Sequence, residues 1–159
     1  MNAGRGFLGR VRIPPLDPLL HLVATFEKQG LAPAVGGSGL LVALGLADTA
    51  RDWDVTVDAE VPPVVAALEH TGLPYRDGTD HDFYATERRY VVDGGDHDLD
   101  LLVNFAIRTP GGTERLPARV TGRWRGVPLA DPAVWARAYR LMNRPAKAET
   151  LERWLADRP

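Results

Sequence analysis

The sequence contains no cysteine among its 159 residues, and it has no long apolar run. Without cysteine the chain can form neither a disulfide framework nor a thiolate metal site. No apolar run approaches the roughly twenty residues that span a bilayer, so no membrane partner is expected. Residues 1 to 15 lack the apolar stretch of a signal peptide. The resulting expectation is a cytoplasmic protein.

The remaining composition is ordinary for one globular domain, with 45% hydrophobic and 25% charged residues. We expect an N-terminal arm over residues 1 to 15 and a single domain over residues 16 to 159. A net charge of −2 gives no support for broad nucleic-acid binding. A local basic groove for tRNA stays open.

Charge is distributed unevenly between two halves of that domain. Residues 48 to 100 hold fourteen acids and four Lys or Arg, whereas residues 106 to 147 hold two acids and nine Lys or Arg. We therefore divide the domain into a core over residues 16 to 105 and a basic part over residues 106 to 159. The acidic half could collect a metal ion, and the basic half could hold a triphosphate. A simple surface bias is the alternative.

Acidic and apolar residues alternate over residues 52 to 58, which read D-W-D-V-T-V-D. Successive side chains of a strand point to opposite faces, so Asp52 and Asp54 share one face. Two neighbouring carboxylates repel each other unless a cation neutralises them, and Mg²⁺ prefers oxygen ligands. The alternative is a half-exposed strand with a polar outer face.

A glycine-rich turn precedes that strand, with Gly36, Gly37 and Ser38 between an apolar strand at residues 32 to 35 and a short helix at residues 40 to 46. Glycine allows close backbone approach to a ligand, and free N–H groups at a helix start attract phosphate. Ser38 is the expected N-cap of that helix. A tight turn with a cap is the alternative reading.

Together the turn, the short helix and the D-x-D strand resemble the signature of the polymerase-β-type nucleotidyltransferase superfamily. Ser38 and Asp52 lie fourteen positions apart, at the long end of that family's spacing. The resemblance covers residues 16 to 105. It implies an α+β fold, in which helices pack on a small mixed or antiparallel sheet and further helices close the C-terminus.

The resemblance also implies a third carboxylate on a neighbouring strand. Residues 97 to 105 read H-D-L-D-L-L-V-N-F, so Asp98 and Asp100 would share one strand face. The family places its third acid in an apolar-D-apolar-apolar context, which L-D-L-L at residues 99 to 102 matches. We therefore prefer Asp100 and hold Asp98 in reserve. A turn at residues 93 to 96 places this strand in an antiparallel hairpin.

Turn and cap signals predict the remaining elements. These are helices beginning at Asp17-Pro18, at residues 61 to 63, at Asp131-Pro132 and over residues 147 to 155, and strands at residues 83 to 86, 89 to 92 and 118 to 124. His81-Asp82 could also belong to a metal phosphohydrolase. That fold is helical, however, and the aromatic and β-branched residues that follow favour strands.

The C-terminal part resembles the closing helices of lincosamide- and abortive-infection-type nucleotidyltransferases, which end in an R-x-K-D-like element. Residues 143 to 148 read N-R-P-A-K-A and lack the aspartate. The resemblance implies a nucleotide-binding role for Arg144 and Lys147. A solvated helix face is the alternative for both.

The resemblance implies a transfer of a nucleoside monophosphate from a nucleoside triphosphate, ATP foremost, to an acceptor hydroxyl on a small molecule, tRNA or protein. Mg²⁺ or Mn²⁺ would be held by Asp52, Asp54 and Asp100, and the phosphates by Gly36, Gly37 and Ser38. The compact size favours a small acceptor, or a homodimer or protein partner that completes the cleft.

Two other functions stay open. A regulatory or toxin–antitoxin component of this fold would bind nucleotide or a partner without transfer. A Rossmann-like dinucleotide binder is disfavoured because Val42 stands where its third glycine would be.

Overall fold

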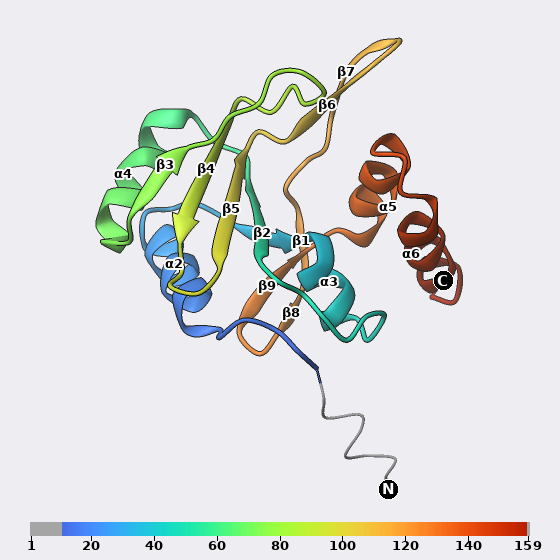
Figure 1. Ribbon diagram of the computed structural model, residues 1–159, viewed down its shortest axis with the longest axis horizontal. Helices are drawn as coiled ribbons and strands as arrows, with labels where there is room; N and C mark the ends of the chain where they lie inside the picture. The colour runs from blue at the N-terminus through green and yellow to red at the C-terminus, as the bar shows by residue number, and fades with distance from the viewer. Residues whose placement is uncertain (1–10, 159) are drawn as a thin grey trace, which may run out of the picture.

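The computed structural model describes residues 11–158 as a mixed seven-stranded sheet with helices packed around it (Figure 1). The strand order is β3-β4-β5-β2-β1-β9-β8, and β6 and β7 form a separate hairpin. The strands are β1 (Ala34–Gly36), β2 (Trp53–Val57), β3 (Tyr75–Asp77), β4 (Arg88–Asp93), β5 (Asp98–Val103), β6 (Ala106–Thr109), β7 (Gly112–Arg115), β8 (Val120–Trp124) and β9 (Val127–Ala130). The helices are α2 (Asp17–Lys28), α3 (Gly37–Ala43), α4 (Val61–Thr71), α5 (Pro132–Leu141) and α6 (Pro145–Ala156). This α+β architecture is the one that the sequence predicts.

Alternation along β2 and β5 divides the sheet into a core face and an open face. Trp53, Val55, Leu99 and Leu101 are fully buried, as are the inward-facing apolar residues of α2 (Leu19, Leu22 and Phe26) and of α4 (Val64, Ala67 and Leu68). The two helices pack together behind this part of the sheet (Figure 1). The intervening residues of both strands, Asp54 among them, therefore turn to the other face.

Strand pairing sets these open-face residues beside one another. The hairpin of β4 and β5 is antiparallel, as predicted, and β5 then pairs with β2 in parallel. The register aligns Asp54 with Asp100. Because parallel pairing needs a long crossover, the chain passes through α4, β3 and β4 between the two acids.

Several local predictions need correction. α3 begins at Gly37, its N-cap is Gly36, and no side chain caps it, so Ser38 lies inside the first turn. Gly37 has a φ of 58°, which lets the chain turn from β1 directly into the helix. Asp17 likewise lies within the first turn of α2, whose N-cap is Leu16.

Residues 83 to 86 do not form the predicted strand. Tyr84 makes one isolated bridge to Ile107 of β6, and the neighbouring Phe83 carbonyl and Ala85 amide bond to the backbone of Arg108 and Ala106. The hairpin of β6 and β7 was not predicted from the sequence. None of the helices in residues 11–158 has the length and apolarity that crossing a bilayer requires.

Helix α5 is capped as predicted. The Asp131 side chain accepts a hydrogen bond from the Ala133 amide at 2.9 Å, and Pro132 occupies the first turn. Asp131 directly follows the last residue of β9, Ala130. The helix that it caps buries Trp135 and Tyr139. Asp131 therefore sets the direction in which α5 departs from the sheet.

Replacing Asp131 by alanine should lower the free energy of unfolding by about 1 kcal/mol or more, because the cap bond to Ala133 is lost together with the partly exposed ion pair to Arg119. Urea denaturation measures this. Asp17→Ala is the matched control: Asp17 makes no cap bond, so its loss should cost only a few tenths of a kcal/mol through the helix dipole. Equal costs for the two variants would contradict the capping role.

Candidate functional site

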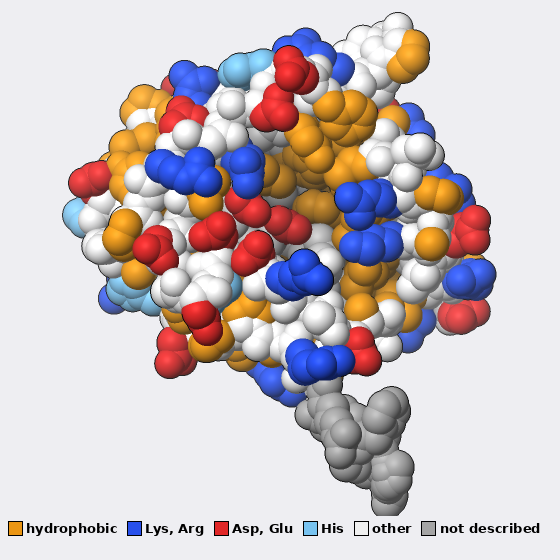
Figure 2. All heavy atoms as spheres, in the orientation of Figure 1, with side chains coloured by type: hydrophobic (Ala, Val, Ile, Leu, Met, Phe, Trp, Pro, Cys, Tyr) orange, Lys and Arg blue, Asp and Glu red, His pale blue; other side chains and the backbone are white. Residues whose placement is uncertain are grey.

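A pocket of about 330 Å³ opens on the open face of the sheet, where β2 and β5 meet α5 and α6. Figure 2 shows its mouth, with acidic side chains gathered at one side of the hollow and basic side chains at the other. Its walls combine charged and aromatic side chains from segments that are distant in sequence: Ser38, Asp54, Thr79, Asp80, Tyr84, Thr86, Arg89, Asp100, Leu102, Phe105, Trp135, Tyr139, Met142, Arg144 and Lys147.

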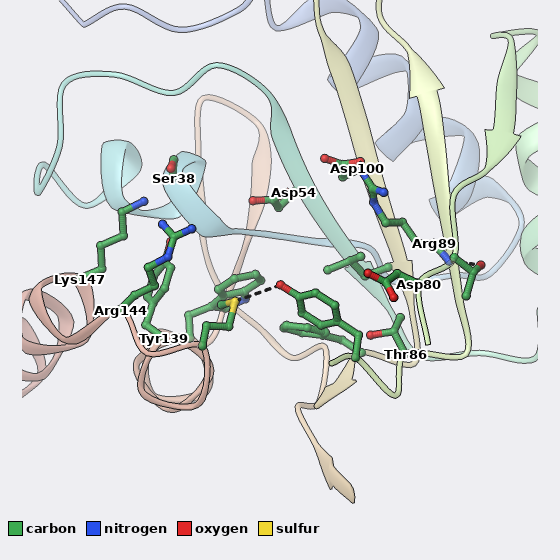
Figure 3. Close-up of a pocket in the computed structure, with 15 residues that line it drawn as sticks. Ser38, Asp54, Asp80, Thr86, Arg89, Asp100, Tyr139, Arg144 and Lys147 are labelled. Atoms are coloured by element: carbon green, nitrogen blue, oxygen red, sulfur yellow. Dashed lines mark hydrogen bonds and ion pairs between the residues drawn. The ribbon is translucent and has the colours of Figure 1, made fainter. Parts of the chain in front are cut away.

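Asp54 and Asp100 form the acidic wall (Figure 3). They are register partners on parallel strands, so their side chains leave the same face side by side. Burial, together with the charges of Asp100 and Asp52, raises the pKa of Asp54 to about 7. Burial also raises the pKa of Asp100, against the lowering effect of Arg89. Two adjacent carboxylates are both ionised only if a nearby positive charge offsets their repulsion.

The glycine turn lies directly against Asp54. A Cβ atom built on Gly37 would be 2.1 Å from Asp54 Oδ2, and one built on Gly36 would be 2.0 Å from the Trp135 ring. Neither contact leaves room for a side chain. The two glycines thus allow the start of α3 to contact the acidic wall on one side and α5 on the other.

Arg144 and Lys147 form the basic wall, and both extend toward Ser38 across the pocket (Figure 3). Asn143, with a φ of 58°, turns the chain between α5 and α6, and so brings Arg144 to the start of α6. The Lys147 Nζ atom lies 5.4 Å from the centre of the Tyr139 ring. Its charge lowers the pKa of Asp54, so the two walls interact electrostatically.

Aromatic side chains line the pocket between those walls. Phe105 and Trp135 have ring centroids 5.3 Å apart, and Trp135 and Tyr139 have theirs 5.7 Å apart. The Tyr84 hydroxyl contacts Met142 Sδ at 3.5 Å across the pocket. Burial raises the pKa of Tyr139 far above its usual value, so its hydroxyl stays protonated. This wall offers a flat apolar surface of the kind that receives a planar ligand.

Arg89 is a pocket residue that the sequence analysis missed. Its guanidinium pairs with Asp100 Oδ1 at 2.8 Å. Arg88 and Arg89 stand side by side at the start of β4. Only the pairing of β4 with β5 shows that Arg89 is the one that contacts Asp100. Asp80, Thr79 and Thr86 were missed for the same reason, since they reach the pocket through loops and long-range pairing.

Asp52 and Asp98 lie outside the pocket lining. The Asp52 carboxylate accepts a hydrogen bond from the backbone N–H of Asp98 at 2.9 Å, two residues before Asp54 and Asp100 on their strands. Within residues 11–158, no three His, Asp or Glu side chains gather closely enough to hold a metal ion. The structure thus brings Asp54 and Asp100 together and leaves Asp52 at their edge, within range of their charge.

Comparison with solved structures identifies the fold. TM1012 from Thermotoga maritima, a proposed nucleotidyltransferase, has 18% sequence identity and a TM-score of 0.62, with 90% of this chain and 93% of that chain covered. ANT(2″)-Ia in complex with adenylyl-2″-tobramycin has 16% identity and a TM-score of 0.56, with 88% of each chain covered. The solution structure of the same antibiotic-resistance factor has 18% identity and a TM-score of 0.54, with 90% of this chain and 91% of that chain covered. This chain has the nucleotidyltransferase fold.

No family model and no curated protein sequence matches the chain. The likeness therefore lies in the three-dimensional arrangement. In this nucleotidyltransferase fold the Gly36–Ser38 turn, the acidic pair and the Arg144–Lys147 wall surround a single pocket.

The nucleotidyltransferase fold implies a divalent cation, and the acidic wall fits one. Asp54 and Asp100 present hard oxygen donors at adjacent positions, which Mg²⁺ and Mn²⁺ prefer. The pKa of Asp54 is raised first by burial and then by the charges of Asp100 and Asp52, and Arg89 only partly offsets these effects. A cation would supply further positive charge, with Asp54 and Asp100 as the residues that hold the cation and Asp52 at their edge.

Gly37→Ala should destabilise the protein more than Gly45→Ala. Both glycines have positive φ, so each substitution costs about 1 kcal/mol in backbone strain. Only the new Cβ at residue 37 collides with Asp54, whereas the one at residue 45 meets no atom within 4 Å. Overpacking should add about 1–3 kcal/mol. Similar unfolding free energies in urea for the two variants would contradict the close contact with Asp54.

The metal-free protein should lose stability through Asp54 as the pH rises from about 4 to 7. The folded pKa of about 7 lies above the usual 3.8. In that window the folded chain therefore keeps a proton that the unfolded chain has released. The loss amounts to as much as about 4 kcal/mol.

Asp54→Asn removes this titration and retains the side-chain shape. In EDTA, the unfolding free energy of the parent minus that of the variant should fall as the pH rises from 4 to 8. Parallel curves would mean that Asp54 ionises at its usual pKa.

Proposed function

We propose that this protein is a metal-dependent nucleotidyltransferase, which moves a nucleoside monophosphate from a nucleoside triphosphate, ATP foremost, to an acceptor hydroxyl. The observation that carries the proposal is the parallel register of Asp54 and Asp100 beside the Gly37 backbone. Two carboxylates suited to a cation thus lie beside a glycine turn suited to phosphate, which supports the proposal.

The triphosphate would lie between the two walls. Ser38 and the backbone of Gly36 and Gly37 would hold the β- and γ-phosphates at the start of α3. Arg144 and Lys147, which reach toward Ser38 from the opposite side, would neutralise their charge. Pyrophosphate would therefore leave toward the basic wall. This assigns a role to every polar group at that end of the pocket.

Asp54 and Asp100 would act at the α-phosphate end. Asp100 would orient the acceptor hydroxyl or accept its proton as the oxygen attacks the α-phosphorus in line with the departing pyrophosphate. Asp54 would hold the cation with Asp100, and Asp52 would add its charge from the edge. A bound divalent cation supplies neutralisation of the phosphate and carboxylate charges. Positioning and charge balance account for most of the rate gain in such transfers.

The acceptor we favour is a small molecule. One structure of ANT(2″)-Ia contains adenylyl-2″-tobramycin, a small molecule that bears an adenylyl group. A volume of about 330 Å³ is at the small end of ligand pockets. A tRNA end or a protein hydroxyl would need a surface beyond the pocket, which a second copy or a partner could provide.

A thermal-shift series with ATP, GTP, CTP and UTP, each with and without Mg²⁺, tests the proposal. A nucleotide at about a hundred times its dissociation constant adds roughly 2.7 kcal/mol to stability, which is several degrees for a chain of this length. The shift should require Mg²⁺ and should be lost in Asp54→Asn. A shift that needs no Mg²⁺ and survives Asp54→Asn would contradict the site.

Asp100→Asn and Asp98→Asn form a matched pair on one strand face. Asp100 lines the pocket and Asp98 does not, so only the former should lose the Mg²⁺-dependent shift. The opposite result would identify Asp98 as the third acid.

Transfer itself is measured with a panel of hydroxyl-bearing compounds, by pyrophosphate release and by a mass gain of one nucleoside monophosphate. Nucleotide binding without release across such a panel would favour the regulatory alternative.

A further inference from the structure

Arg89 is the positive charge inside the pocket that directly contacts an acidic residue of the wall. It lies on β4, where the register pairs it with Leu102 of β5. It therefore shares the open face with Asp100, diagonally across the strand pair. Its side chain is 39% exposed and that of Asp100 is 19% exposed, so the ion pair lies at the pocket wall, partly shielded from water.

The guanidinium makes two kinds of contact. Its Nε and Nη2 atoms both donate to Asp100 Oδ1, at 3.2 and 2.8 Å. Its Nη1 atom donates to the Gly78 carbonyl at 3.2 Å, and the Arg89 backbone N–H donates to Thr79 Oγ1 at 3.0 Å. Both guanidinium bonds to the carboxylate thus converge on one oxygen, and the rest of the residue is fixed to the loop beside the pocket (Figure 3).

This arrangement places Arg89 where it affects both acids. Its charge lowers the pKa of Asp54 as well as that of Asp100. The neighbouring Arg88 pairs with Asp77 at 3.9 Å and is not part of the pocket lining. Successive strand residues face opposite ways, so the two arginines separate into one pocket residue and one residue outside it.

We propose that Arg89 is the resident counter-ion of Asp100 in the metal-free protein, and that a divalent cation binding to the acidic wall competes with it. This rests on the metal-dependent function proposed above and adds a regulation of the same site. The free protein then binds a divalent cation weakly. The cation binds well only together with a triphosphate, whose negative charge offsets the repulsion from Arg89.

The physical basis is the range of Coulomb interactions inside a protein pocket. A guanidinium bound to one oxygen of Asp100 lies close to any cation that uses the same carboxylate. At the effective dielectric of such a site, repulsion between a single and a double positive charge greatly exceeds thermal energy. The cation must also share a carboxylate that already accepts two charge-assisted hydrogen bonds. Both effects weaken binding, and both vanish when Arg89 is neutral.

The test is Mn²⁺ binding to the full, EDTA-stripped protein, measured by isothermal calorimetry without nucleotide. Arg89→Gln should bind Mn²⁺ about tenfold more tightly than the parent, because the competing charge is gone. Arg88→Gln makes the same charge change one residue away and should leave the affinity unchanged. Arg89→Lys retains the charge and should also stay near the parent value.

Further variants locate the ion and its dependence on nucleotide. The gain should disappear in the double variant Arg89→Gln/Asp100→Asn. With a saturating non-hydrolysable ATP analogue, the difference between parent and Arg89→Gln should shrink, because the triphosphate supplies the missing negative charge. Thermal unfolding of each variant verifies that it is folded.

Unchanged or weaker Mn²⁺ binding in folded Arg89→Gln would overturn the inference, as would an equal gain in Arg88→Gln or Arg89→Lys. If the parent binds Mn²⁺ in a manner that Asp54→Asn abolishes, the proposed metal site survives that failure. The absence of Mn²⁺ binding in every variant, even with the ATP analogue, would overturn the metal site and the competition together.

Discussion

The burial of Asp54 beside a second carboxylate, Asp100, is the constraint on which the rest of the site depends. Parallel pairing of β2 and β5 holds the two carboxylates at aligned positions, and burial raises the pKa of Asp54 to about 7. The groups around the two acids compensate their negative charge. Arg89 pairs with Asp100, Lys147 lowers the pKa of Asp54 from the opposite wall, and the pocket leaves room for a cation.

The hydrophobic core is what can hold the acids together. On the reverse face of the same two strands, Trp53, Val55, Leu99 and Leu101 are fully buried against α2 and α4. Burial of such side chains is a large favourable contribution to folding, and ionisation of the buried Asp54 opposes folding by as much as about 4 kcal/mol. Alternation along the two strands therefore links stability and function. The apolar residues on one face stabilise the fold, and the acidic residues of the pocket lie on the other face.

The sequence predicted those features of the fold that depend on local pattern. Alternation over residues 52 to 58 and 97 to 105 identified β2, β5 and their polar face, and Asp131-Pro132 identified the start of α5. It failed where long-range geometry decides. Ser38 is not a cap, because the φ of Gly37 starts α3 earlier. The pocket role of Arg89 was not predicted either, because it depends on the β4–β5 register.

The fold brings the acidic and basic parts of the chain to opposite walls of one pocket. The acidic residues of β2 and β5 and the basic residues of α6 and its N-cap come from opposite parts of the sequence, and the turn at Asn143 brings them to facing walls. A pocket with one negative and one positive wall polarises whatever enters it. A triphosphate with a bound cation matches that polarity, since its anionic end can meet Arg144 and Lys147 while the cation meets Asp54 and Asp100. Neither component alone satisfies both walls, which makes joint binding the state that best balances the charge of this pocket.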